Sequence, residues 1–342
     1  MEGSLREPRQ RAVTNESTTM GGVLHLRLIS PSARTDEVVS VLEDCTGVTN
    51  IAVVEGAARE PRGDLIFCDV AREAANEVID KVRWLEHEGS IAVEHVDLSI
   101  SHAAAEAEEQ APGDGDDAVV WAELAQRVDD DLRLTWAYLA FIAIATQLAG
   151  IGVVTNSLVV IVGAMVLGPE FGAIAAACFG LLTGRLRLVG RALRILAIGF
   201  AVGIAITFAC ALVSRGLGWI DHDSLDIGHE EVQFIVKPDR WSFIVALLAG
   251  AAGVLSVTAG KSSALVGVFI SVTTIPAAGY AAVAMALGDW PEVGGSALQL
   301  FVNIAGMVIS GTAVLYLQRT IWPQGMSRGS SARTRPQGGL RG

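Results

Sequence analysis

The chain has 342 residues, of which 51% are hydrophobic, and its formal net charge is −12. This composition excludes an ordinary soluble one-domain protein unless the apolar residues gather into long runs, and from residue 136 onward they do. The acidic balance argues against nucleic acid as a partner, because binding to phosphates needs clustered Lys and Arg side chains.

The N-terminal third alternates strand and helix patterns. Residues 1–20 are polar and charged, which predicts a disordered tail without the apolar core of a secretory signal. Residues 21–102 follow the order β-α-β-β-α-β, with period-two alternation in the strands and apolar spacing of three to four residues in the helices. This order predicts a ferredoxin-like α+β domain with two helices on one face of a four-stranded antiparallel sheet. Such domains bind regulatory small molecules or mediate assembly.

Two short segments precede the apolar part. Residues 103–118 are rich in Ala, Glu, Gly and Asp, and we expect a tethering linker with too little apolar surface to pack. Residues 119–134 place apolar side chains on one face, which predicts an amphipathic helix at the membrane surface.

Residues 135–320 are predicted to be a membrane domain, because a helix needs roughly 20 mainly apolar residues to cross the hydrocarbon core. We expect six spanning helices followed by a disordered tail at 321–342. The predicted spans are Trp136–Val154, Ser157–Thr183, Leu193–Val213, Ser242–Ala259, Ala264–Leu287 and Ala297–Leu317. The Arg-rich connections fall on the side of the N-terminus, so the positive-inside rule places both termini in the cytoplasm.

The six spans divide into two similar units of three. Trp136 and Trp241 each begin an apolar span, which a short polar break separates from a second span containing Gly163 or Gly267. Because three spans are an odd number, the second unit would enter the membrane from the opposite side. That is the inverted repeat of many secondary transporters.

The second helix of each unit contains a proline at a comparable depth. Gly168 and Pro169 interrupt the first, and Pro276 interrupts the second after Thr273 and Thr274. Proline removes a donor and frees backbone carbonyls, which in a membrane need protein partners or a wet cavity. We therefore predict one polar site between two broken helices, and the alternative is a pair of packing kinks.

Glu170 follows Pro169 directly and is the acid that we expect inside the membrane. A carboxylate in hydrocarbon costs several kcal/mol unless it is protonated, paired or hydrated, so we predict that Glu170 binds a cation or carries a proton. A shallower position or a structural pair with Arg185 are alternatives. Candidate neighbours are Thr273, Thr274, Asn156, Ser157 and Asn303, each of which could instead be a helix-packing hydrogen bonder.

Enzyme motifs are absent: no GxSxG, Walker loop, HExxH or dinucleotide fingerprint occurs at a suitable junction. The four cysteines lack metal-ligand spacing, so we expect neither a metal nor a cofactor. His222 and His229 lie in an acidic loop, where a divalent metal site or a solvated loop are both open.

The membrane part resembles the domain of unknown function 389 family, a group of hydrophobic bacterial membrane proteins. The resemblance is carried by Gly163–Val166 with Pro169 and Gly172, by Gly267–Ile270 with Pro276, and by Asn303. Ala173 and Ala277 stand where members often have further prolines, and Glu170 replaces an apolar residue. The resemblance implies a multi-pass protein of the bacterial inner membrane and assigns no activity.

These observations predict a transporter or channel-like protein with a regulatory or assembly domain, in contact with lipid and with a small solute or ion. The alternative is a membrane-anchored sensor or scaffold whose soluble domain binds a ligand or partner. A polar cavity between the broken helices would favour the first, and an apolar seam of small residues the second. The many Gly and Ala residues also lead us to expect a homo-oligomer.

Overall fold

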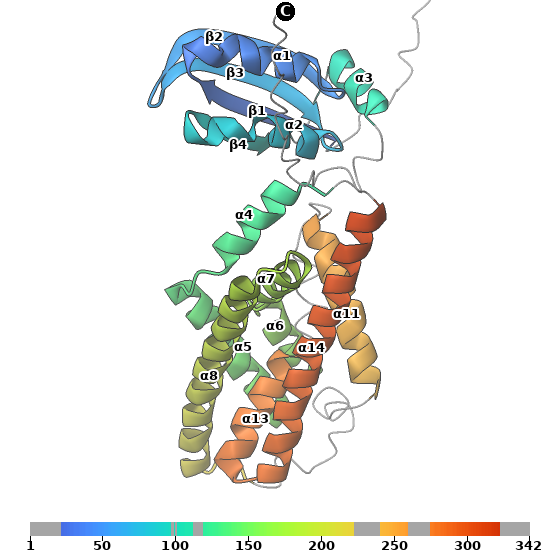
Figure 1. Ribbon diagram of the computed structural model, residues 1–342. Coiled ribbons are helices and arrows are strands. Elements are labelled where there is room, and N and C mark those ends of the chain that lie inside the picture. Colours follow the sequence, from blue (N-terminus) through green and yellow to red (C-terminus); the bar gives the residue numbers. More distant parts are fainter. Residues whose placement is uncertain are drawn as a thin grey trace, which may run out of the picture. The chain divides into compact units, whose positions relative to one another are not determined.

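The computed structural model describes residues 22–96, 99, 101–111, 119–221, 240–258 and 274–321. These residues form two compact units, one before and one after residues 112–118 in the sequence (Figure 1). Both predicted tails, the second half of the predicted linker, His222, His229 and Thr273 lie outside the described residues.

The N-terminal unit is a four-stranded antiparallel sheet with the strand order β2-β3-β1-β4. The predicted succession of strands and helices is confirmed. The strands are β1 (Val23–Ser30), β2 (Val48–Arg59), β3 (Arg62–Ala71) and β4 (Ser90–His95), and the helices are α1 (Thr35–Glu43) and α2 (Ala75–Val82), with 3-10 turns at Ser32–Arg34 and Arg83–His87.

Both helices pack on one face of the sheet. Leu24, Leu26 and Leu28 of β1 are fully buried because alternate residues of a strand point to the same face. The helices contact each other and bury Val38 and Val78 against this face. The apolar face of β1 and the apolar faces of α1 and α2 thus form one core.

The predicted linker begins with a helix, which corrects the expectation that this segment does not pack. Helix α3 (His102–Gln110) starts at Ser101, whose hydroxyl accepts a hydrogen bond from the Ala104 amide at 3.2 Å. Its small buried residues Ala104 and Ala107 let it approach β2 and β3. The composition is poor in large apolar side chains, but a serine cap and an alanine face suffice for a short helix that rests on a sheet.

Asp64 of β3 joins the start of α1 to the irregular part of β2 between Val54 and Ala58. Its buried carboxylate accepts hydrogen bonds from the hydroxyls of Thr35 (2.6 Å) and Ser32 (2.7 Å) and from the amide of Gly56 (2.8 Å). These donors, led by Thr35, lower the pKa of Asp64, and burial opposes them. A carboxyl whose pKa is lower in the folded state contributes stability above its unfolded pKa, and this contribution is lost as the pH falls through the folded pKa.

We therefore expect Asp64→Asn to lower the unfolding temperature of this unit at pH 7, because the ionised form is the one that the three donors stabilise. The gap between wild type and variant should narrow steadily once the pH drops below about 4, the unfolded pKa of Asp. Far-ultraviolet circular dichroism of the full chain, followed against temperature at several pH values, measures both. A gap that stays constant down to pH 2 would contradict this account.

The second unit is a bundle of apolar helices that begins with an amphipathic one. Helix α4 (Trp121–Asp131) buries Leu124 and Val128 and packs against α7, so the predicted amphipathic helix is present. The longer helices are α5 (Trp136–Val154), α8 (Leu186–Gly216), α11 (Arg240–Thr258) and α14 (Trp290–Ile321), and the shorter ones are α6 (Leu158–Val166), α7 (Phe171–Leu182) and α13 (Ile275–Leu287).

Within the described residues, four helices are long and apolar enough to cross a membrane, and the bent pair α6–α7 makes a fifth crossing if it forms one span. Of the fifth predicted span, Ala264–Leu287, only α13 and the preceding Thr274 are described, because residues 264–273 lie outside the described part. The predicted spans at 193–213 and 297–317 are the apolar middles of longer helices, since α8 and α14 have 31 and 32 residues.

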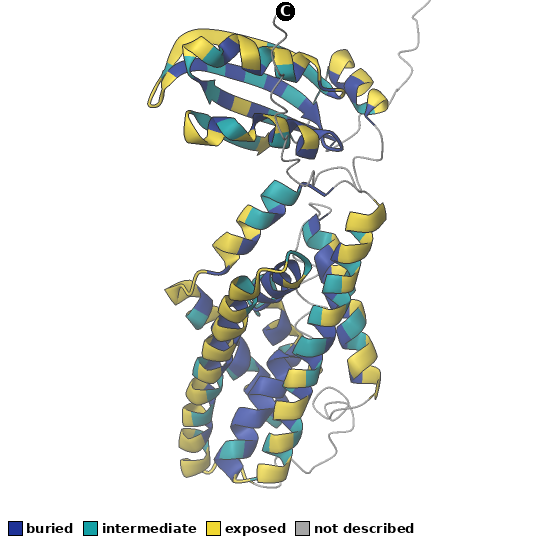
Figure 2. Ribbon diagram, in the orientation of Figure 1, coloured by how far each residue is buried: buried dark blue, intermediate teal, exposed yellow. Residues whose placement is uncertain are grey.

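The outer surface of the bundle is apolar. Figure 2 shows exposed residues along the outside of α8 and α14, and these include Val213 and Phe301, which are 62% and 70% exposed. Small residues fill the inside, where Ala176, Ala278 and Ala282 are fully buried. An apolar exterior around an interior of small side chains is the pattern of helices that pack in lipid. The long apolar helices are those of a membrane protein.

Candidate functional site

The first predicted broken helix is present. Helix α6 ends at Val166, α7 begins at Phe171, and their axes differ by 55°. Pro169 explains the break, because its ring excludes the helical backbone hydrogen bond and disfavours helical geometry in the preceding residue. The amides of Leu167 and Gly168 close the end of α6 on the carbonyls of Ala164 and Met165. The residues between the two helices therefore form a short bridge that ends at Glu170.

The second proline lies at the start of a described helix. Helix α13 begins at Ile275 with Thr274 as its N-cap, so Pro276 sits in the first turn, where its missing amide has no helical acceptor. The predicted interruption at Pro276 also involves residues 264–273, which lie outside the described residues. Thr274 and the whole of α13 from Ile275 to Leu287 except Met285 are buried.

A hydrogen bond connects Glu170, at the start of α7, with Thr274, at the start of α13. The Thr274 hydroxyl Oγ1 donates a hydrogen bond of 2.7 Å to Oε1 of Glu170, and both residues are fully buried. Each is also the residue that immediately precedes a helix, α7 in one case and α13 in the other. The polar side chains of two helix starts therefore meet inside the bundle, as predicted for Glu170 and Thr274.

The depth of this junction follows from the helix lengths. The 13 residues of α13 span about 20 Å at 1.5 Å per residue, and the nine of α6 span about 14 Å. Helix α6 starts from a turn, and α13 ends at a turn, at the same end of the bundle, the end opposite to the N-terminus of α5 (Figure 1). The hydrocarbon core is about 30 Å thick. Glu170 thus lies well inside the bundle, and the alternative of a pair with Arg185 is not seen, because Arg185 is exposed and forms no ion pair among the described residues.

Two further predicted site residues lie at the turn between α5 and α6. Asn156 has a φ of 49° in the α5–α6 turn, and the Ser157 hydroxyl accepts the amide of Val160 at 3.4 Å as the N-cap of α6. The length of α6 separates both from Glu170, so they shape a turn. Asn303 is fully buried on α14.

Three further polar groups of the membrane unit were not predicted from the sequence. Gln299 is fully buried on α14, and neither atom of its amide has a hydrogen-bond partner among the described residues. It lies one turn before Asn303, so the spacing of the two along a helix was the available signal. Tyr138 of α5 is buried as well, with its hydroxyl unpartnered among the described residues.

The third is Asp131, at the end of α4. Its side chain lies against Gly172 in the first turn of α7, where an added Cβ would come within 2.7 Å of Asp131 Oδ2. Loss of solvation raises the pKa of Asp131, and Arg127 opposes this. A second carboxyl therefore stands at the same end of α7 as Glu170, and a glycine is needed for it to do so.

Two further observations concern ligands. No group of three or more His, Cys, Asp or Glu side chains that could hold a metal occurs in the described part of the chain. A cavity of ≈240 Å³ is present in the membrane unit, but α5, α8, the residues after α8 and α13 line it, and Glu170 and Thr274 do not.

Comparisons with known proteins agree with the membrane part. Residues 165–309 match the model of the family described as "Domain of unknown function (DUF389)". An uncharacterised protein of Methanocaldococcus jannaschii is 23% identical over 241 residues, which cover 69% of this chain and 72% of that protein. No solved structure matches. The resemblance inferred from Gly163–Val166, Pro169 and Pro276 is thereby confirmed: residues 165–309 of this chain are similar to the domain of unknown function 389, and this segment contains the bend between α6 and α7 and the junction of Glu170 with Thr274.

Proposed function

We propose that this protein is a membrane transporter or channel-like protein in which Glu170 carries a proton or binds a cation at the junction of two interrupted helices. One observation carries the proposal: the hydrogen bond from Thr274 to Glu170, with both side chains fully buried and each at the start of a helix. Acids inside membrane helices are costly and usually mark ion or proton pathways.

The physical chemistry of the junction favours a group that changes its charge state. Burial disfavours the ionised carboxylate, whereas the positive ends of α7 and α13 and the Thr274 hydroxyl favour it. Asp131, against the first turn of α7, supplies a second carboxyl on the α4 side, which supports a proton route between that surface and Glu170.

The packing supports two repeated units of three spans. The first and third helices of each unit pack together, as α5 does with α8 and α11 with α14. The half-helices α7 and α13 each contact both α8 and α14. Exchange of the two units leaves this pattern of contacts unchanged. An inverted repeat of six spans accounts for it.

The remaining parts complete the proposal. The strand order β2-β3-β1-β4 supports a ferredoxin-like domain, which would regulate the membrane part or assemble a homo-oligomer. Arg-rich connections near α4 and between α7 and α8 support a cytoplasmic position for both termini in a bacterial inner membrane. We assign no enzymatic activity and no cofactor.

Proton flux into vesicles tests this function without knowledge of a solute. The full chain is reconstituted into liposomes that contain a pH-sensitive dye, and a potassium gradient with valinomycin sets the membrane potential. We expect the dye to report acidification well above that of protein-free liposomes. Flux equal to the protein-free background, with sodium and potassium movement also at background, would contradict transport and leave the sensor or scaffold hypothesis.

A further inference from the structure

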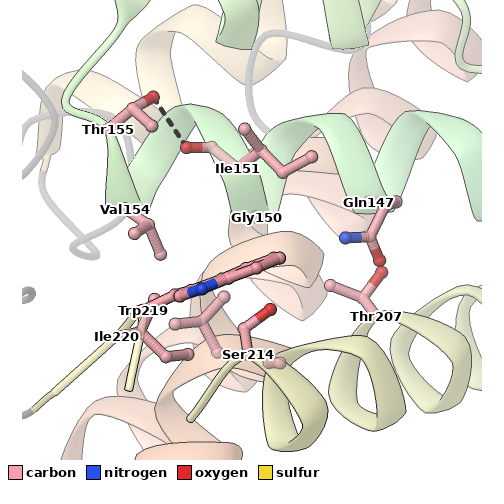
Figure 3. Close-up of a pocket in the computed structure, with 11 residues that line it drawn as sticks. Gln147, Gly150, Ile151, Val154, Thr155, Thr207, Ser214, Trp219 and Ile220 are labelled. Carbon is pink, nitrogen blue, oxygen red and sulfur yellow. Dashed lines mark hydrogen bonds between the residues drawn. The ribbon is translucent and has the colours of Figure 1, made fainter. Parts of the chain in front are cut away.

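The ≈240 Å³ cavity lies between α5 and α8 and is closed on a third side by Val283 of α13. Figure 3 shows the indole of Trp219 lying across the cavity between side chains of α5 and α8. Trp219 is 74% exposed, so it stands at the mouth, while Thr207 is buried at the other end. The described residues that line it are Gln147, Gly150, Ile151, Val154, Thr155, Thr207, Ala211, Ser214, Trp219, Ile220 and Val283.

The inner end of the cavity carries unused hydrogen-bonding capacity. Gln147 Oε1 and Thr207 Oγ1 are buried, and neither has a hydrogen-bond partner among the described residues. Figure 3 shows the Gln147 amide and the Thr207 hydroxyl facing each other at this end. A buried acceptor without a donor is unfavourable. The inner end therefore suits a ligand that brings one N–H or O–H group.

The described part of the lining favours an uncharged ligand, because it contains no Asp, Glu, Lys or Arg. The neighbouring cation, Arg215, donates a hydrogen bond of 2.7 Å to the carbonyl of Ala286, so its charge is directed at the main chain of α13. Val154, Ile220 and the Trp219 ring form apolar walls. An aromatic body can pack against these walls and against the indole of Trp219.

The size and depth of the cavity narrow the class of ligand further. A cavity of about 150 Å³ holds benzene, so ≈240 Å³ accommodates a molecule with two fused rings. Thr155 and Ser214 lie at the ends of α5 and α8. Gln147 lies eight residues before Thr155, which is about 12 Å deeper along a helix. A ligand therefore enters at the membrane interface and places its polar group inward.

We propose that this cavity is a binding site for an uncharged two-ring aromatic molecule with a single N–H or O–H donor, of the indole and naphthol class. The site is separate from the Glu170–Thr274 junction, and its existence does not depend on transport. Val283 belongs to the same helix as Thr274, so a bound ligand contacts the half-helix whose start touches Glu170.

Indole itself is the probe. The full chain in lipid nanodiscs is titrated with indole by calorimetry, and empty nanodiscs of the same lipid are titrated in parallel. We expect saturable binding to one site per chain beyond the partition into lipid. Thr207→Val keeps the shape and removes the hydroxyl, and it should weaken Kd about tenfold.

Ala211→Trp fills the cavity and should abolish binding. Ala209→Trp is the matched control, because Ala209 lies on the exposed face of the same helix two residues away, and it should bind indole as the wild type does. If Ala211→Trp fails to fold, the Kd of Thr207→Val for indole tests the assignment. Naphthalene, which lacks the donor, should bind at least tenfold more weakly than indole.

Three results would overturn the assignment. The first is indole uptake no greater than in empty nanodiscs. The second is equal binding of indole and naphthalene, together with a Kd for indole that Thr207→Val leaves unchanged. The third is a phospholipid that remains bound to the wild type but not to Ala211→Trp, while indole does not bind. The last would make the cavity a seat for a lipid chain.

Discussion

Glu170→Gln is expected to reduce proton flux to the background of protein-free liposomes, a loss of at least about 100-fold for a group that acts by proton transfer. The amide has nearly the same shape as the carboxyl, and its oxygen can still accept the hydrogen bond from Thr274. The junction of α7 and α13 therefore stays intact, while the group can no longer gain or lose a proton. Loss of flux in a folded, monodisperse variant would isolate the chemistry of the carboxyl from its packing.

Thr274→Val should have a smaller effect of the same sign, about tenfold, since it removes one donor from the carboxylate and leaves the acid in place. The matched control is Glu123→Gln, which removes an acid from α4, outside the apolar helices. Flux measured at several external pH values completes the test, because a wild-type pH dependence should disappear in Glu170→Gln. Wild-type flux in Glu170→Gln at every pH would remove Glu170 from any proposed pathway.

The second large effect concerns the closest approach of α5 and α13. A Cβ added at Gly279 would lie 2.7 Å from the Gly150 amide nitrogen, 2.7 Å from Ala149 Cβ and 2.9 Å from the Thr146 carbonyl oxygen. Two of these three atoms are backbone, which cannot move without a shift of the whole helix. We expect Gly279→Ala to destabilise the membrane unit by about 1–3 kcal/mol, and Gly279→Val by more.

Gly163 provides the matched control on α6, since a Cβ added there meets nothing within 4 Å. Gly163→Ala should stabilise slightly, by about 0.5–1 kcal/mol, because alanine loses less conformational freedom than glycine in a helix. The two variants make the same change in helix interiors and are expected to shift the unfolding temperature in opposite directions. Thermal unfolding in detergent, followed by size-exclusion chromatography, measures both. Equal shifts of the unfolding temperature in the two variants would mean that helix propensity, rather than the close contact at Gly279, determines the change in stability.

Much of the architecture followed from the sequence because it rests on local patterns. The spans at 136–154 and 242–259 agree closely with α5 and α11, since long apolar runs allow no other structure in lipid. Pro169 located the break between α6 and α7 for an equally local reason. The alternation in β1 and the spacing in α1 and α2 predicted the strand and helix order of the N-terminal unit.

Other features depend on contacts between distant segments. The sequence did not indicate that α3 would pack on the sheet, because its alanine face acquires meaning only where β2 and β3 accept it. Asp131 and Gly172 are 41 positions apart, and no periodicity connects them. The position of Thr274 against Glu170 also depends on a contact between segments 104 positions apart.

The sequence by itself therefore determined the membrane character of residues 136–321, the first helix break, the family resemblance and the choice of Glu170 as the acid to test. The reason is that hydrocarbon penalises every exposed polar group, so each polar residue in an apolar run can be recognised from the sequence. Only the tertiary structure decided that Thr274 is the partner of Glu170, that Asn156 and Ser157 belong to a turn, and that a cavity opens between α5 and α8. These depend on which helices become neighbours, and among helices of similar apolar composition that choice is made by close packing of small side chains.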